Sequence, residues 1–478
     1  MIKKILIAVG VLVALVLAPF AWFEFRPLPP AGRGDAARGE WEFMHSDLGS
    51  KYFGSIPRVI FEALPRLYPE LFVEGWEGSV GLIPDPSDPQ GPPIGMVRAS
   101  ILGSEWYAPN CALCHAGRAA AAGNRIVPGA PNYDLDVQRL LYVIEQPIRR
   151  GLSLADVERV THPLSALEKL SVGTFLVFAR WKVAHKPDGW FKNETGAGRS
   201  DALNGWKRAL GLDTSGHKTI VDIPDVFDQR LKSKTLYDGA ITGDEAARVM
   251  LTELQKGRPP RGPLIEREVF DDLVAYMKGP LKPPAYPYPI NTAMAQNGHQ
   301  VFSANCAKCH GTYAPDTATY PNLRISADTV GTDPERALAM GDDLTAALQK
   351  YDFRYFLKID PAPTYMPPPL DGIYLTAPYL HNGSIPTLWH LLHPDSRPVA
   401  FYRRFNSFDP AHVGFPCEER PAEGGTECGP DESQRKHDPR VLYRLDTRLT
   451  GNSNAGHRYG STLPESDKTA LLEYLKTI

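Results

Sequence analysis

Apolar residues recur at helical spacing in several segments of the chain. In residues 58–67 and 135–148 they return every three or four positions, which predicts an amphipathic helix in each segment. The same spacing in residues 294–302 predicts a helix that ends just before Cys306. Near the C-terminus, Ser466 is a predicted N-cap for a final helix with an apolar face. With 41 glycines and 45 prolines, a higher share than average, we expect a mainly α-helical fold with extensive loops.

The N-terminus carries two lysines and then an uncharged apolar run. Residues 5–23 contain no charged side chain, and about 20 apolar residues are enough to cross a bilayer. The aromatic residues at the end of the run make a poor signal-peptide cleavage site. We therefore expect residues 1–25 to be a signal-anchor, or transmembrane segment, in the inner membrane. A cleaved signal, which would leave a soluble or secreted protein, is the alternative. In both cases the rest of the chain is exported to the periplasm.

A proline-rich stretch divides the chain. Residues 279–290 contain five prolines, which is typical of a semi-rigid linker. The predicted domains are residues 26–285, with a loop-rich insertion at residues 190–239, and residues 286–478. The formal net charge is −3, so the chain has no basic excess for binding nucleic acid.

Two copies of the motif Cys-x-x-Cys-His carry the clearest chemistry. They are Cys111, Cys114 and His115, and Cys306, Cys309 and His310. In this motif the two thiols add to the vinyl groups of haem, and the histidine is the proximal ligand of the iron. A thiol redox pair needs no following histidine, and a zinc site would have to join motifs 195 residues apart. We predict two covalently attached haem c groups, one in each of two cytochrome-c-like domains.

Two cysteines remain outside these motifs. Cys417 and Cys428 lie in one loop, and exported proteins reside where disulfides persist. We expect a disulfide between them, worth on the order of 3 kcal/mol in the chain-entropy model. Two free thiols are the alternative.

The two haem motifs differ in the residues that follow them. Residues 116–161 contain neither histidine nor methionine, so we expect the iron of the first haem to be open. A distant histidine could still close it, and the candidates are His45, His162 and His185. Candidates for the second haem are Met366, His381, His390, His393 and His457. An open iron binds oxygen or peroxide, whereas a closed iron carries electrons.

Several segments resemble those of known di-haem proteins. Residues 377–388 (Ala-Pro-Tyr-Leu-His-Asn-Gly-Ser-Ile-Pro-Thr-Leu) resemble a signature of the di-haem cytochrome c peroxidases and the related MauG enzymes. A narrower resemblance, to the RoxA-like rubber oxygenases, is carried by residues 401–402, 408–415, 451–457 and 473–477. Looser matches to that family are residues 54–57, 63–69, 110–115, 198–204 and 222–229. The resemblance therefore covers most of the chain after residue 25.

The resemblance to the RoxA-like family implies roles for individual residues. His115 would be proximal at an oxygen-binding haem, and His310 and His457 would be the axial pair of a closed haem. This favours His457 over Met366. His381 would line the region between the haems. Where that family has tryptophan, this chain has Phe227 and Tyr237; both could relay an electron, although core packing is the ordinary role of such residues.

These observations lead to a functional hypothesis. The chain is expected to be a periplasmic di-haem c-type cytochrome that activates dioxygen or peroxide at the first haem, with the second haem as electron relay. A RoxA-like oxygenation of an apolar or unsaturated organic substrate is the main hypothesis. Alternatives are a MauG-type or di-haem cytochrome c peroxidase and a pure electron-transfer cytochrome. A periplasmic electron donor and the inner membrane are the expected partners.

Overall fold

The computed structural model describes ten stretches of the chain. These are residues 32–48, 54–185, 195–227, 229–252, 254, 267–313, 317–350, 355–403, 408–429 and 443–478. The predicted membrane segment, residues 1–25, lies outside them. In the part of the chain that is described, no helix is both long and apolar enough to cross a bilayer.

The expectation of a mainly helical fold is wrong, whereas the membrane segment expected at residues 1–25 stays a prediction. The structure is 41% helix and 16% strand, with several small sheets and no membrane-spanning helix among the described residues. The strands are two to six residues long. A segment that short shows too few alternations for a period-two pattern to stand out from loop sequence, and this is why the sheets were missed.

The helices fall on both sides of the proline-rich stretch. Those before it are α2 (Ala36–His45), α3 (Arg58–Leu67), α4 (Gly75–Val80), α5 (Ala112–His115), α6 (Val137–Arg149), α7 (Leu154–Val160), α8 (Ala166–Ala184), α9 (Ala202–Ala209), α10 (Glu245–Thr252) and α11 (Arg267–Lys278). Those after it are α12 (Thr292–Asn305), α13 (Ala307–His310), α14 (Ala327–Val330), α15 (Glu335–Leu338), α16 (Asp342–Leu348), α17 (Leu388–Leu392) and α19 (Glu465–Leu475).

The strands form six small sheets among the described residues. One sheet has the order β1 (Ile56–Pro57), β3 (Ser104–Pro109) and β2 (Met96–Ile101). A second joins β11 (Leu357–Ile359), β9 (Ile241–Gly243) and β8 (Lys234–Thr235). The four-stranded sheet has the order β14 (Glu419–Ala422), β15 (Gly425–Cys428), β13 (Ala400–Arg403) and β16 (Tyr443–Asp446). The three pairs are β4 (Ala116–Ala119) with β5 (Arg125–Pro128), β6 (Arg199–Ser200) with β7 (Val221–Asp222), and β10 (Ile325–Ser326) with β12 (Thr364–Tyr365).

The helices with the clearest periodicity form where the sequence predicts them. Helix α3 has the predicted bounds, and α6 and α12 lie within a few residues of theirs. The last helix begins at Glu465, after Pro464, and Ser466 lies inside it. The predicted cap at Ser466 is therefore wrong, because the preceding proline already sets the extended backbone from which the helix starts.

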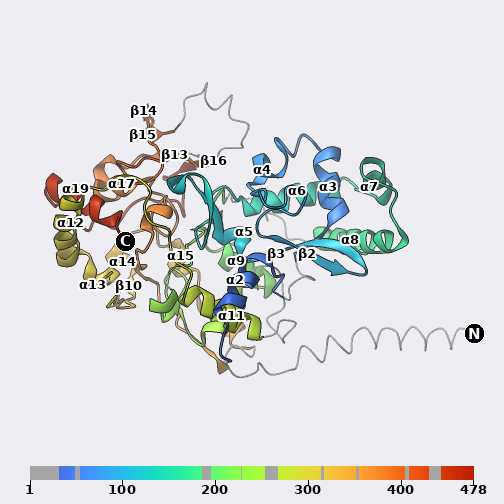
Figure 1. Ribbon diagram of the computed structural model, residues 1–478, viewed down its shortest axis with the longest axis horizontal. Coiled ribbons are helices and arrows are strands. Elements are labelled where there is room, and N and C mark those ends of the chain that lie inside the picture. The colour runs from blue at the N-terminus through green and yellow to red at the C-terminus, as the bar shows by residue number, and fades with distance from the viewer. Residues whose placement is uncertain are drawn as a thin grey trace, which may run out of the picture.

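Two pairs of helices pack side by side, one in the C-terminal part of the molecule and one near its centre. Figure 1 shows α12 beside α19 at one end, and α2 beside α11 near the middle. A Cβ built on Gly298 of α12 would lie 1.9 Å from the carbonyl oxygen of Ala470 in α19. Only glycine permits this approach of the two backbones. The pairing holds α12, and so the Cys306 motif at its end, against the C-terminal helix.

The buried apolar residues form two large clusters. One packs α3, α6, α7 and α8 against the first sheet. The larger cluster contains Phe43, Trp206, Phe302 and Leu471, residues from both sides of the predicted boundary at residue 285. Helix α2, the first in the described part of the chain, and the C-terminal helix α19 thus belong to one core.

The contact between α2 and α11 contains two buried carboxylates that share one arginine. The Nε of Arg38 lies 3.0 Å from Glu42 and 3.3 Å from Asp272. Burial and the neighbouring Asp272 carboxylate raise the pKa of Glu42 to about 7. The folded state therefore holds this proton more tightly than the unfolded chain. The resulting stabilisation is complete below the unfolded pKa of 4.5 and is lost as the pH rises through about 7.

Substituting Glu42→Gln should remove this pH dependence. The melting temperature of the wild type is expected to fall between pH 5 and pH 8 more than that of the variant, because the amide does not ionise. The matched control is Glu268→Gln, since the Glu268 carboxylate lies 3.4 Å from the same arginine but is 66% exposed. If the melting temperatures of wild type and Glu42→Gln changed equally between pH 5 and pH 8, the raised pKa of Glu42 would be contradicted.

Candidate functional site

The two Cys-x-x-Cys-His motifs have the same local structure. In each, the backbone N–H of the histidine donates to the carbonyl of the first cysteine, over 3.0 Å for His115 and 3.0 Å for His310. Each imidazole also places its Nδ1 against a proline carbonyl, at 2.9 Å from Pro224 and 2.8 Å from Pro368. A histidine that donates from Nδ1 to a carbonyl presents its unprotonated Nε2 to a metal. Both histidines therefore have the orientation of axial ligands.

Burial keeps these two imidazoles neutral. It lowers the pKa of His115 to about 4, and it also lowers the pKa of His310. Neutral imidazole is the form that binds a metal ion.

The imidazole ring of His457 faces that of His310. The centres of the two rings lie 6.3 Å apart, with 59° between their planes. An iron bound by two imidazole nitrogens at about 2 Å each separates the ring centres by roughly 6 Å, because each centre lies about 1 Å behind its nitrogen. The spacing of the two histidines therefore fits a haem iron with both axial positions filled.

The backbone around His457 is held in an uncommon conformation. His457 has φ 45°, and a Cβ built on Gly456 (φ 76°) would lie 2.3 Å from the backbone of Gly331. The His457 N–H donates to the carbonyl of Val330 over 2.9 Å. A non-glycine residue with positive φ is costly and persists only where the surrounding structure enforces it. The close packing on residues 330–331 thus directs His457 toward His310.

One large cavity contains both motifs. Its volume is about 1380 Å³, and its lining includes Cys114, His115, Cys309, His310 and His457. Pockets for a single small ligand usually span about 300–1,000 Å³ and are mostly apolar. Leucine, isoleucine, valine and phenylalanine side chains supply much of this lining. The cavity has the size and polarity for large apolar groups such as haem.

A cluster of aromatic side chains lies in the wall of the cavity. The rings of Tyr365 and His381 stack with centres 4.3 Å apart, and the Tyr365 hydroxyl lies 3.1 Å from His381 Nε2. The Tyr237 ring approaches His381 edge-on at 6.3 Å, and its hydroxyl donates to the carbonyl of Asp222. Burial lowers the pKa of His381 to about 3, so this imidazole is neutral. Tyr365 was not singled out from the sequence, because its role depends on a partner 16 residues away.

Comparisons with known proteins place this chain. Residues 364–402, which include Tyr365 and His381, match the model of the RoxA-like, cytochrome c-like family. The Uncharacterized protein y4iM of Sinorhizobium fredii is 30% identical over 322 residues, which cover 59% of this chain and 70% of that protein. The chain belongs to the y4iM family. The Uncharacterized protein y4iJ of the same organism is 29% identical over 266 residues, and the match spans 41% of each chain.

The matched domain identifies the cofactor of this y4iM-family protein. A RoxA-like, cytochrome c-like domain implies haem c, and the resemblance to the RoxA-like family is confirmed at that level. The motif residues fit this group: two thiols and an oriented histidine converge on one cavity at each site. The protein is a haem-c-binding cytochrome.

The remaining predicted site residues lie in different places. Tyr237, His381 and the alternative ligand Met366 line the cavity. Phe227 is 1% exposed and packs in the core, where a Cβ built on Gly129 would lie 2.5 Å from its ring. Phe227 is not among the cavity-lining residues. Its predicted part in electron relay remains a prediction.

The alternative ligands of the first haem lie elsewhere. Among the described residues, His45, His162 and His185 do not line the cavity. His162 contacts Glu168 on the surface, and His185 caps the end of α8. Two methionines that the sequence reasoning did not weigh, Met96 and Met277, do line it. No local signal marks them, because each occupies an ordinary apolar position of its strand or helix.

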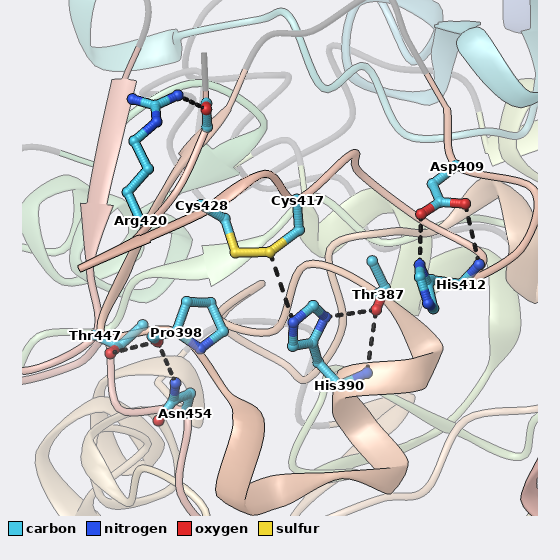
Figure 2. Close-up of a disulfide and its surroundings, with 11 residues drawn as sticks. Thr387, His390, Pro398, Asp409, His412, Cys417, Arg420, Cys428, Thr447 and Asn454 are labelled. Atoms are coloured by element: carbon cyan, nitrogen blue, oxygen red, sulfur yellow. Dashed lines mark hydrogen bonds and ion pairs between the residues drawn. A yellow bond between two sulfur atoms is a disulfide. The ribbon is translucent and has the colours of Figure 1, made fainter. Parts of the chain in front are cut away.

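The predicted disulfide between Cys417 and Cys428 is confirmed. Figure 2 shows His390, on α17, pointing at it, with Nε2 3.6 Å from the Cys417 sulfur. The other ring nitrogen lies 2.7 Å from the Thr387 hydroxyl. His390 and His393 do not line the haem cavity, so in this structure their contacts are structural.

Proposed function

We propose that this protein is a di-haem c-type cytochrome in which the first haem, at His115, activates dioxygen or peroxide, while the second, at His310 and His457, relays electrons. The observation that carries the proposal is the asymmetry of the two sites. His310 faces a second imidazole at bis-histidine spacing, whereas the histidines that the sequence offered for the first site do not line the cavity. A free axial position is what ligand activation requires.

The chain's own side chains are suited to electron transfer between the two sites. Haem c would supply oxygen binding and one-electron chemistry. The buried Tyr365 and His381 and the half-buried Tyr237 occupy the wall of the cavity that holds both motifs. The Tyr237 hydroxyl is held by the Asp222 carbonyl and the Tyr365 hydroxyl by the Asp333 carbonyl. Hydrogen-bonded phenols of this kind can transfer an electron together with a proton.

The reaction is proposed to be RoxA-like oxygenation of an apolar or unsaturated compound. The match at residues 364–402 and the apolar cavity lining support it. A MauG-type or di-haem peroxidase reaction, which the same geometry accommodates, is the second candidate. It would give fast reaction with peroxide and no oxygen incorporation into a substrate.

The setting of the reaction is part of the proposal. The disulfide Cys417–Cys428 supports an oxidising compartment such as the periplasm. There the protein would receive electrons from a periplasmic donor.

Carbon monoxide binding tests the proposal directly. The reduced protein is expected to bind about one carbon monoxide for every two haems, because only the haem at His115 has a free position. The measurement is a titration followed by the Soret band, with haem quantified separately. Absence of any carbon monoxide spectrum would reject both enzymatic functions and leave an electron carrier, and binding at both haems would reject the assigned asymmetry.

A further inference from the structure

The longest helix of the described chain, α8, is apolar on two opposite faces. Val172, Leu176 and Ala179 are buried in the core. Five large apolar side chains on the other side are more than half exposed: Leu167, Leu170, Val177, Phe178 and Trp181. A surface helix is normally polar on its outer face. Figure 1 shows α8 beside β2 and β3, at the end of the molecule opposite α12 and α19.

The exposed side chains form a stripe along one side of α8, which the exposed Thr174 interrupts between Leu170 and Val177. They recur at intervals of three, seven, one and three residues along α8, spacings that keep them on one side of a helix. Single exposed apolar residues are common on protein surfaces, but a contiguous row marks an interaction site. The stripe therefore has the character of an interaction surface.

The stripe is continuous with the rim of the haem cavity. Phe178 belongs to both, because it is 55% exposed and also lines the cavity. Leu102, in the turn between β2 and β3, and Leu141, on α6, likewise are exposed and line the cavity. A Cβ built on Gly103 would lie 3.0 Å from Leu167, so this turn lies against α8. Three elements thus surround an apolar opening.

The charges on α8 indicate what covers the stripe. The first turn of α8 contains Glu168, and the adjacent Lys169 is paired with Glu158 at 3.1 Å. Toward the end of the helix, beside Val177, Phe178 and Trp181, the charged residues are Arg180 and Lys182, and no acidic residue occurs there. The Lys182 ammonium lies 5.6 Å above the Phe178 ring, an arrangement that lets the lysine stem cover apolar surface. Exposed tryptophan, phenylalanine and leucine flanked by basic residues are typical of helices that lie in the plane of a membrane surface.

We infer that α8, with Leu102 and Leu141, docks the protein onto a lipid bilayer with anionic headgroups. The apolar stripe inserts at the level of the upper acyl chains, and Arg180 and Lys182 contact the headgroups. Docking places the cavity opening against the bilayer. An apolar compound dissolved there would then reach the cavity without crossing water; this consequence rests on the proposed function, whereas the docking itself does not.

Photocrosslinking with lipids tests the docking. The full-length, haem-loaded protein is mixed with vesicles of phosphatidylethanolamine and phosphatidylglycerol that carry a diazirine in an acyl chain. After illumination, adducts are mapped by mass spectrometry. We expect adducts at Val177 and Trp181, and none at Tyr355 or Leu449, which are 68% and 55% exposed elsewhere on the molecule. Adducts absent from α8, or equally frequent at Leu449, overturn the inference.

A matched pair of variants separates docking from folding and from catalysis. Val177→Glu should lower the α8 adducts several-fold, because a carboxylate on the stripe opposes both the acyl chains and the anionic headgroups. Leu449→Glu should leave them unchanged. Neither residue lines the cavity, so both variants should keep the carbon monoxide spectrum of the wild type, whatever that spectrum is. A dimer found by analytical ultracentrifugation without vesicles, and lost in Val177→Glu, would instead assign the stripe to a second copy. Equal adducts with purely phosphatidylcholine vesicles would reject the anionic preference.

Discussion

Replacing His457 by alanine is expected to convert the second haem from a closed, low-spin site to one that binds external ligands. His457 faces His310 at 6.3 Å between ring centres, so its imidazole is the proposed sixth ligand and alanine cannot replace it. In the reduced variant, carbon monoxide should bind about two haems instead of one. Absorption and electron paramagnetic resonance spectra of the oxidised variant should show loss of the bis-histidine low-spin signal.

Met366→Leu is the matched control for this experiment. Met366 lines the same cavity and is 7% exposed, and leucine preserves its apolar volume. This variant should keep the wild-type spectrum. The reverse pattern, with a normal spectrum in His457→Ala and a changed one in Met366→Leu, would assign the ligand to Met366. Added imidazole should restore the low-spin spectrum of His457→Ala, which a general loss of structure would not allow.

Replacing Arg403 by alanine is expected to destabilise the fold by about 3–5 kcal/mol, the usual cost of removing one partner from a buried ion pair. The Arg403 guanidinium is fully buried and lies 2.5 Å from the Asp222 carboxylate, whose side chain is 4% exposed. Without Arg403, the carboxylate of Asp222 loses its closest cationic partner. Urea denaturation followed by far-UV circular dichroism measures the change in the free energy of unfolding.

The loss of Arg403 should also disturb the wall of the haem cavity. The backbone N–H of Asp222 donates to the carbonyl of His381 over 2.8 Å, and its carbonyl accepts from Tyr237. The control is Arg150→Ala, which removes an ion pair with Glu70 that is about half exposed and should cost less than about 1 kcal/mol. Equal losses in the two variants would contradict the buried-pair argument. The double variant Asp222→Asn with Arg403→Met should be less destabilised than Arg403→Ala, because no unpaired charge is left.

The buried network around Arg403 could not have been read from the sequence. Arg403 and Asp222 are 181 residues apart, and each looks like an ordinary surface residue in its own segment. Arg199 is likewise fully buried, and it donates a hydrogen bond to the side-chain amide oxygen of Asn452, 253 residues away. Pairing of this kind depends on the packing of β6, β7 and β13, whose two to four residues show no periodic pattern.

The sequence by itself determined the features that depend on neighbouring residues. The thiols and the histidine of each Cys-x-x-Cys-His motif lie within five consecutive positions, so local spacing is enough to predict them as haem-attachment residues. Helix α3 and the helix before Cys306 follow from the same short-range periodicity. The disulfide between Cys417 and Cys428 closes a short loop and was also predictable.

The tertiary structure decided what depends on distant residues meeting. It alone shows that His457 faces His310, 147 positions away, and that both haem motifs open into one cavity. It also shows that one apolar face of α8 is buried while the other is exposed. The pattern of hydrophobic residues along the chain does not reveal which face packs against the core. Side-chain proximity across such separations arises from packing of the whole chain, and local sequence carries no direct signal for it.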